Sequence, residues 1–124
     1  MIKIRNKRLL QDIYKRDPWK MLVCCVMLNL TTRKQVDSVR EKLFKRYPSA
    51  ASMAFCWEDE LSKIIGQLGM QNKRAYTLKR FSLEFLRGFE DVSELYGIGQ
   101  YGKDSWEIFQ NNNQDSCFID WLVG

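Results

Sequence analysis

The residues between Leu95 and Gly102 form the pattern in this sequence that is best suited to bind a ligand. Gly97 and Gly99 stand on either side of Ile98, with one helical segment predicted before them and another after them. Glycines let a backbone turn sharply and approach a ligand, and a helix that starts after such a turn directs free N–H groups and its positive dipole end outward. The spacing predicts a helix-hairpin-helix that binds phosphate, with Ile98 inserted into the core. An ordinary corner between two helices, capped by glycine, is the alternative.

Few side chains in this sequence can transfer a proton near neutral pH. Histidine is absent, and the four cysteines, at positions 24, 25, 56 and 117, contain no Cys-x-x-Cys pair. This excludes imidazole catalysis and the usual zinc or redox cysteine sites, so no metal and no other cofactor are expected. Carboxylates, lysines and tyrosines remain as acid and base groups.

The carboxylate best placed to act near the hairpin is Asp115. It follows a polar loop and stands at the expected start of the last helix, where the helix dipole favours its ionised form. A simple N-cap role is the alternative. Asp104, on the second helix of the hairpin, and Asp120, in the last segment, are weaker candidates.

The elements that carry these residues are all predicted to be helices. No stretch alternates apolar and polar residues, so the fold class is all-α. Asp17 and Pro18 supply an N-cap and a first-turn proline for an apolar helix that runs to about Leu30. Further helical segments are expected at about 1–16, 32–46, 49–55, 57–68, 72–87, 91–95, 102–109 and 115–123. The side chains expected to face the core from the helix at 72–87 are Leu78, Phe81, Phe85 and Leu86.

Size and composition predict one domain over residues 1–124, with the hairpin at about 93–109. A chain of 124 residues, of which 45% are hydrophobic and 13% aromatic, can build one core but hardly two. Twenty Lys and Arg against fifteen Asp and Glu give a net charge of +5, which favours a polyanionic partner only slightly. The longest apolar run, Met21 to Leu30, is too short to cross a bilayer, and no secretory signal is apparent. An intracellular protein without membrane contact is therefore expected.

Six blocks of sequence, taken in order, match one known family. They are Asp17 to Lys20, Leu28 to Asn29, Lys45 to Ala50, Leu68 to Gly69, Arg74 to Ala75 and Gly97 to Ser105. Together they resemble the HhH-GPD superfamily of DNA glycosylases, and within it the glycosylase domain of methyl-CpG-binding domain protein 4. The resemblance spans about residues 12–123. It implies two helical lobes around a DNA-binding cleft, and with it we expect a monomer in the nucleus.

The resemblance implies a monofunctional DNA glycosylase of base excision repair. Such an enzyme binds double-stranded DNA with a mismatched or deaminated base, flips thymine or uracil opposite guanine into a pocket, and hydrolyses the N-glycosidic bond. Tyr101 stands where relatives that also cut the strand carry a lysine, and a phenol cannot form the imine that strand cleavage needs. No iron–sulfur cluster is expected, because only Cys117 follows the hairpin, where some relatives have four cysteines.

The same resemblance assigns residues to the base pocket and to DNA contact. Tyr101 and Asn29 are expected to line the pocket, and a core aromatic is the alternative for Tyr101. Met70 matches an apolar wedge that enters the duplex, and Leu30 stands where relatives carry an arginine that fills the vacated base stack. A helix-end methionine and a buried leucine are the alternatives. The residues expected to contact DNA are Leu30, Met70, Arg74, Gly97, Gly99, Gln100, Gly102 and Lys103.

The resemblance gives Asp115 the catalytic role, because one aspartate after the hairpin stabilises the cationic sugar and helps position water in this family. Asp115 stands six residues after Phe109, whereas the family spacing is about a dozen residues. The catalytic segment is thus shortened, so a DNA-binding variant with impaired catalysis is the alternative. A third reading, a helical protein-interaction domain without DNA affinity, is disfavoured by cations on the expected cleft-side loops. These cations are Arg33, Lys34, Lys73, Arg74 and Lys103.

Overall fold

The computed structural model describes residues 8–111 and contains helices but no strand in that range. In chain order the elements are α2 (Leu10–Ile13), α3 (Pro18–Met27), α4 (Arg33–Arg46), α5 (Ala50–Ala54), α6 (Glu58–Ile64), η1 (Gly66–Leu68), α7 (Gln71–Arg87), η2 (Val92–Glu94), α8 (Gln100–Trp106) and η3 (Glu107–Asn111). Of these, η1 and η2 are 3₁₀ turns and η3 is a π-helical turn that continues α8. The all-α prediction is confirmed. The helix expected at 115–123 lies outside the described residues.

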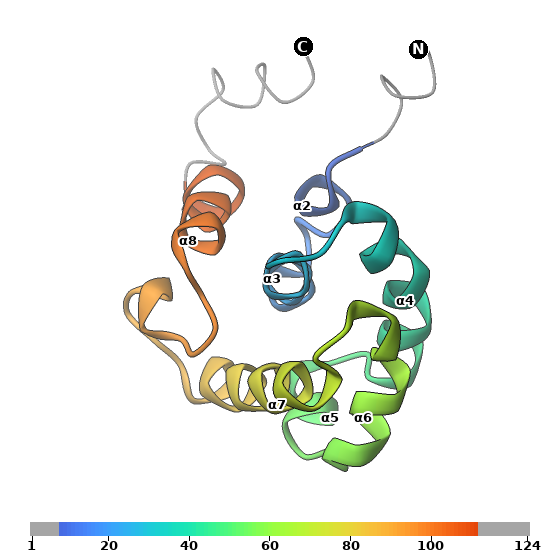
Figure 1. The fold of residues 1–124 in the computed structure, drawn as a ribbon. Coiled ribbons are helices and arrows are strands. Elements are labelled where there is room, and N and C mark those ends of the chain that lie inside the picture. The colour runs from blue at the N-terminus through green and yellow to red at the C-terminus, as the bar shows by residue number, and fades with distance from the viewer. Residues whose placement is uncertain (1–7, 112–124) are drawn as a thin grey trace, which may run out of the picture.

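Helix α3 lies at the centre of the fold, with the other helices arranged around it (Figure 1). Eight of its ten residues are buried, and it contacts α2, α4, α7 and α8. The predicted start is confirmed, because the Asp17 carboxylate accepts a hydrogen bond from the Lys20 N–H and Pro18 opens the first turn. The predicted end at Leu30 is wrong. The helix ends at Met27, and Leu30 has a left-handed backbone with φ of 62°.

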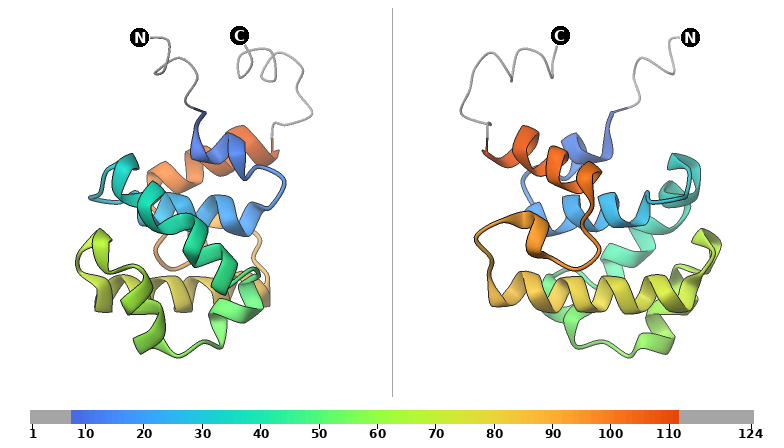
Figure 2. Two further views of the ribbon diagram at one scale, coloured as in Figure 1. Left: turned by 90° about the vertical axis from the view of Figure 1, so that its right-hand side faces the viewer. Right: turned by 60° about the vertical axis from the view of Figure 1, so that its left-hand side comes forward.

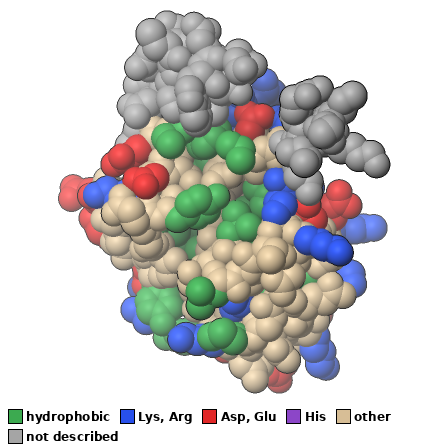
Figure 3. All heavy atoms as spheres, turned by 45° about the horizontal axis from the view of Figure 1, so that its top comes forward, with side chains coloured by type: hydrophobic (Ala, Val, Ile, Leu, Met, Phe, Trp, Pro, Cys, Tyr) green, Lys and Arg blue, Asp and Glu red, His purple; other side chains and the backbone are tan. Residues whose placement is uncertain are grey.

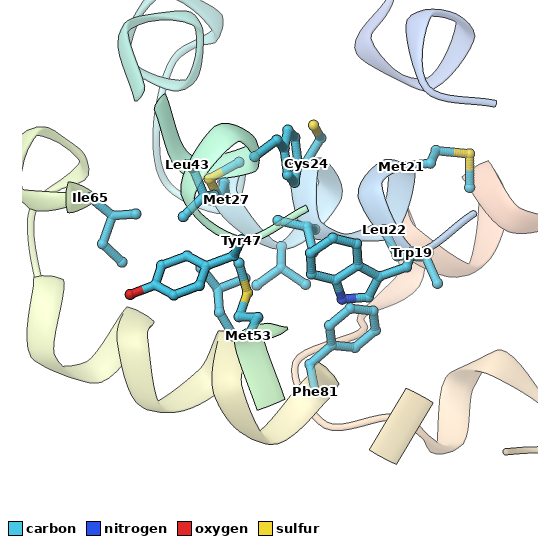
Figure 4. Close-up of a cluster of buried hydrophobic side chains, with 14 of the residues drawn as sticks. Trp19, Met21, Leu22, Cys24, Met27, Leu43, Tyr47, Met53, Ile65 and Phe81 are labelled. Atoms are coloured by element: carbon cyan, nitrogen blue, oxygen red, sulfur yellow. The ribbon is translucent and has the colours of Figure 1, made fainter. Parts of the chain in front are cut away.

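The core is built where α3 meets the helices that surround it. Side chains of α3 pack with Leu43 of α4, Tyr47, Met53 of α5, and Phe81 of α7 (Figure 4). Buried polar groups are paired, as shown by the Trp19 indole N–H, which donates to the Ser82 hydroxyl at 2.9 Å. Within residues 8–111 no fully buried side-chain nitrogen or oxygen lacks a hydrogen-bond partner. The core therefore fixes the position of α3 without unpaired polar groups.

Helix α4 is fixed by its capping residue and by ion pairs. Thr32 and Gln35 form a capping box at its start. The Asp37 carboxylate accepts hydrogen bonds from Arg33 at 2.8 Å and Arg40 at 2.9 Å. Partial burial alone raises the pKa of Asp37, but the two guanidinium groups outweigh it and hold that pKa below its ordinary value.

Helix α7 runs beneath α3 and packs on α5 and α6, on the side of α3 opposite α8 (Figure 2). Leu78 and Phe81 are buried as predicted, and Phe85 is partly buried. Leu86 is 45% exposed, so its predicted core position is wrong. Gly88 ends the helix, and the chain then returns so that Phe89 packs against Phe85, with ring centroids 5.5 Å apart, rather than over Leu86.

Several large hydrophobic side chains remain exposed on the surface of this small fold. Figure 3 shows one face of the molecule, on which hydrophobic side chains gather near the middle and Lys and Arg side chains lie around the edges. Among residues 8–111, no helix combines the length and apolar character that crossing a membrane requires. The same residues contain no group of three or more cysteine or acidic side chains arranged to hold a metal ion.

Candidate functional site

An open pocket of about 700 Å³ lies between the end of α3 and the hairpin that leads into α8. Its lining residues come from two segments that are far apart in the sequence. They are Cys25, Val26, Leu28, Asn29 and Leu30, and Gly97, Ile98, Gly99, Gln100, Tyr101 and Gly102. The pocket therefore joins both residues predicted to line it, Asn29 and Tyr101, to the glycine turn. A volume of this size fits a small molecule or a nucleotide.

Helix α7 holds the hairpin in place at its first glycine. Gly97 has φ of 87°, and a Cβ atom at this position would lie 2.7 Å from Cγ2 of Thr77. Just before it, the Tyr96 N–H donates to the Glu84 carboxylate at 2.7 Å. Glycine is thus required at 97 both by the backbone conformation and by the close approach to α7. Ile98 packs against the core, as predicted.

The second glycine of the turn serves a different purpose. Gly99 is the N-cap of α8 and has an ordinary negative φ, and no atom lies within 4 Å of a Cβ built there. No side chain caps the start of α8. The backbone at Gly99 is therefore left uncovered at the pocket. Gly102, in contrast, is buried, with Ile98 Cγ2 at 3.1 Å from a Cβ built on it, so packing accounts for this glycine.

Tyr101 lines the pocket, as predicted, and is 52% exposed, so the alternative of a core aromatic is wrong. Its hydroxyl accepts a hydrogen bond of 2.5 Å from the side-chain amide of Gln11, and the same amide donates to the Ser105 hydroxyl at 3.0 Å. Gln11 is 4% exposed. Since the Tyr101 hydroxyl already accepts from Gln11, its own proton is directed away from that amide and is available to another acceptor.

The thiol in the pocket wall is not a nucleophile at neutral pH. Burial raises the pKa of Cys25 to about 11, although a hydrogen bond with Ser105 partly opposes the increase. Burial raises the pKa of Cys24 even further. The pocket therefore offers hydrogen-bonding groups and backbone amides rather than a reactive cysteine.

A second pocket, of about 210 Å³, lies on the other side of Asn29 and Leu30. It is also lined by Met70, Lys73 and Arg74 of the segment that starts α7. Leu30 is 82% exposed and Met70 is 54% exposed. The alternative of a buried Leu30 is therefore wrong, and both residues predicted to enter DNA extend from the surface beside the pockets.

Arg74 connects the two loops that carry these apolar side chains. Its Nε donates to the carbonyl oxygen of Gly69 at 2.9 Å, and its Nη1 donates to the carbonyl oxygen of Asn29 at 2.8 Å. Partial burial lowers the pKa of Arg74, but a guanidinium remains charged at neutral pH.

The remaining predicted residues lie at different distances from the pockets. Gln100 lines the larger pocket, and its side-chain amide donates to the Asp104 carboxylate at 2.7 Å. Lys103 lies on α8 and lines neither of these two pockets. Arg33 pairs with Asp37 and also donates to the carbonyl of Arg8. Asp115 and Asp120 lie outside the described residues, so the catalytic assignment stays a prediction.

Comparison with known proteins gives one consistent group of relatives. The chain is 38% identical to a methyl-CpG-binding domain protein 4-like protein of Arabidopsis thaliana over 108 residues, which cover 86% of this chain and 24% of the relative. It is 38% identical to a thymine/uracil-DNA glycosylase of Pyrobaculum aerophilum over 93 residues, 68% of this chain and 40% of that protein. It is 34% identical to a thymine-DNA glycosylase of Aeropyrum pernix, over 68% of this chain and 42% of that protein.

The fold matches the solved structure of a thermostable thymine-DNA glycosylase with a TM-score of 0.77, over 87% of this chain and 52% of the other. The chain belongs to the HhH-GPD superfamily of DNA glycosylases. Sequence identity to the solved structure is 22%, so this likeness shows the fold alone. No protein-family model matches the chain. The chain spans less than half the length of the curated relatives described above.

One residue that orients a side chain of the larger pocket, Gln11, was missed by the sequence analysis. It contacts Tyr101 and Ser105, which are separated from it by most of the chain. A signal was present, because Gln11 is an uncharged polar residue that directly follows the core residue Leu10 in a short amphipathic segment. Its partner could not be deduced, since the contact depends on how α2 packs beside α8.

Proposed function

We propose that this chain is a monofunctional DNA glycosylase that releases thymine or uracil from mispairs with guanine, as one step of base excision repair. The observation that carries the proposal is the pocket of about 700 Å³ that joins the hairpin backbone to the loop of Asn29 and Leu30. A base flipped from a duplex needs such a cavity beside a site that holds the DNA backbone. The names of the relatives from Pyrobaculum aerophilum and Aeropyrum pernix support the same substrate class.

The roles of the described residues follow from their chemistry. The uncovered backbone at Gly99 and the start of α8 bind a phosphate oxygen, since the first N–H groups of a helix attract anions. The Tyr101 hydroxyl, oriented by Gln11, donates a hydrogen bond to an exocyclic carbonyl of the flipped pyrimidine. Met70 and Leu30 occupy the space in the duplex that the base leaves.

Asp115 supplies the carboxylate that the hydrolysis requires. A carboxylate close to the sugar stabilises the positive charge that develops as the N-glycosidic bond breaks, and it orients the attacking water. The partner is double-stranded DNA, and the expected nuclear location is supported by the Arabidopsis thaliana relative.

The test is base release measured under single-turnover conditions, together with binding. Duplexes that contain one G:U or G:T pair are compared with a fully paired duplex, for the parent chain and for Asp115→Asn. We expect the parent to release the base from the mispaired duplexes, and Asp115→Asn to bind the same duplexes with at least a thousandfold slower release.

Other results would change the proposal in defined ways. Binding to mispaired DNA without release by the parent would show the DNA-binding variant with impaired catalysis. Equal release by the parent and Asp115→Asn would remove Asp115 from the catalytic role. If the chain bound DNA in no salt-dependent way, a helical protein-interaction domain would be the remaining interpretation.

A further inference from the structure

Leu30 and Met70 share an unusual backbone conformation. They are the two non-glycine residues with positive φ within residues 8–111, at 62° and 48°. A left-handed conformation is unfavourable for a residue with a Cβ atom, so it persists only where the surroundings impose it. Both side chains are exposed, so packing of the side chains does not impose it. The cause must act on the backbone.

The hydrogen bonds of Arg74 act on the backbone at these two points. The carbonyl of Asn29 belongs to the peptide that leads into Leu30, and the carbonyl of Gly69 belongs to the peptide that leads into Met70. Because φ measures the rotation of a residue against its preceding peptide, a donor that fixes the orientation of this peptide restricts φ. One guanidinium thus restrains both left-handed residues, although they lie in separate loops.

The two loops have few other connections to each other. Leu30 lies between α3 and α4, whereas Met70 lies between η1 and α7. Gln35 of α4 donates to the carbonyl of Gln67 at 3.1 Å, which links the bases of the loops but not their tips. Both tips line the smaller pocket together with Arg74. The Arg74 guanidinium therefore joins the tips of the two loops directly.

We propose that Arg74 is a positioning residue that braces the Leu30 and Met70 loops and thereby holds both apolar side chains in the geometry needed to keep a base flipped out of the duplex. This inference rests on the proposed glycosylase function and deepens it. It differs from the role expected for Arg74 by resemblance, in which the guanidinium contacts DNA directly. A lysine cannot perform the bracing role, because one ammonium does not present two fixed, coplanar donors.

The first part of the test uses the protein without DNA. Hydrogen exchange of the segments around 28–30 and 69–70 is compared in the parent, Arg74→Lys and Arg74→Met. The matched controls are Arg87→Lys and Arg87→Met, at the exposed end of the same helix. We expect faster exchange than in the parent in both segments for either Arg74 variant, and exchange rates equal to those of the parent for the Arg87 variants. Unchanged exchange in the 28–30 segment of Arg74→Met would overturn the brace. Thermal unfolding of each variant identifies any that fails to fold, in which case Arg74→Lys alone decides.

The second part measures base flipping and the salt dependence of binding. The flipping signal is the fluorescence of 2-aminopurine placed beside a G:U pair. We expect Arg74→Lys and Arg74→Met each to lower the rise in 2-aminopurine fluorescence on binding, and the rate of base release, about tenfold, since each variant loses a charged hydrogen bond. The slope of log affinity against log salt should not change, because no phosphate contact is removed. A different result would overturn the proposal: a slope reduced by about one in Arg74→Met, together with flipping retained by Arg74→Lys, would show that Arg74 contacts a phosphate.

The two proposals can fail separately in these experiments. If the parent chain neither flips nor releases the base, the glycosylase function fails, and the hydrogen-exchange comparison still decides the brace. If the parent flips and releases the base and Arg74→Lys does so equally well, the glycosylase function stands and the bracing role of Arg74 is wrong.

Discussion

At the residue scale, the pocket depends on how one hydroxyl is oriented. The Tyr101 hydroxyl accepts from a buried glutamine that also donates to Ser105, so the Gln11 amide joins α2 to two residues of α8. A buried amide that donates both its protons is rigid, and it leaves the tyrosine only one useful direction for its own proton. In the proposed function this proton is donated to a carbonyl of the flipped pyrimidine. A phenol in this position can recognise a base but cannot attack a sugar carbon as an amine would.

The hydroxyl of Tyr101 can be tested with a change of one atom. Tyr101→Phe should slow single-turnover uracil release about tenfold, because one hydrogen bond to the base is lost. Its free energy of unfolding should fall by about 1–3 kcal/mol, since the buried Gln11 amide loses one of its two acceptors. Tyr76→Phe, another partly exposed tyrosine whose hydroxyl accepts from Arg80, is the control and should retain the parent rate. If Tyr101→Phe releases uracil at the parent rate, the hydroxyl does not contact the base.

At the element scale, the hairpin combines two glycines with unlike requirements. Gly97 is fixed by positive φ and by Thr77 of α7, whereas Gly99 is open to the pocket. The sequence shows two glycines at a typical spacing and cannot distinguish them. The distinction depends on which side of the turn α7 covers, and that follows only from the packing of the fold.

Alanine at each of these glycines should therefore give opposite results. Gly97→Ala should lower the free energy of unfolding by about 2 kcal/mol, because it adds a left-handed penalty to a steric clash. Gly99→Ala should leave stability within about 0.5 kcal/mol but should weaken DNA binding, since the methyl group would lie against a phosphate. Urea unfolding and fluorescence anisotropy with a labelled duplex measure the two effects.

A second substitution separates the two causes at Gly97. Thr77→Ser removes the Cγ2 atom that a new Cβ would approach, so Gly97→Ala with Thr77→Ser should regain part of the lost stability but not the part due to φ. An equal loss of stability in Gly97→Ala and Gly99→Ala would contradict this account of the turn.

Signals that act over a few residues were predicted correctly from the sequence. The cap at Asp17 and the helices predicted at 32–46 and 72–87 depend on neighbouring residues, and each is observed within about one residue. The errors arise where distant segments decide the outcome. Leu30 continues an apolar run, yet the chain leaves α3 before it and exposes it. Leu86 fits a helical stripe, yet no element covers it.

The candidate site could be predicted only in part, for the same reason. The pocket position of Tyr101 followed from the hairpin and the family resemblance, whereas the exposure of Met70 at the start of α7 fits both the expected wedge and the alternative of an exposed helix-end methionine. The role of Gln11 and the two carbonyls bound by Arg74 could not be predicted, because each contact joins segments far apart in the sequence. Tertiary packing decides such contacts, and local patterns do not report it.

At the scale of the whole molecule, one face combines two kinds of group with separate physical roles. Lys73 and the hairpin lie near the pockets and can attract phosphates, whereas Leu30 and Met70 extend as apolar side chains. Lys73 makes no ion pair or side-chain hydrogen bond within residues 8–111, so its charge is available to a partner. Electrostatic attraction does not depend on base sequence and weakens as salt rises, whereas an apolar wedge favours sites where the pair is already weak. Affinity and selectivity should therefore respond to different substitutions.

This separation gives the last prediction. Lys73→Gln should weaken binding to mispaired and fully paired duplexes alike and reduce the slope of log affinity against log salt by about one, because one phosphate contact is lost. Met70→Ala should leave the slope unchanged and lower the preference for the mispaired duplex severalfold, because the space left by the base is no longer filled. Titrations of both duplexes at three or more salt concentrations measure slope and preference together. Lys45→Gln, on the exposed last turn of α4, is the control for a loss of charge elsewhere. If Met70→Ala changed the slope and Lys73→Gln changed the preference, the assignment of charge to affinity and of apolar side chains to selectivity would be wrong, since the wedge would then act through the DNA backbone.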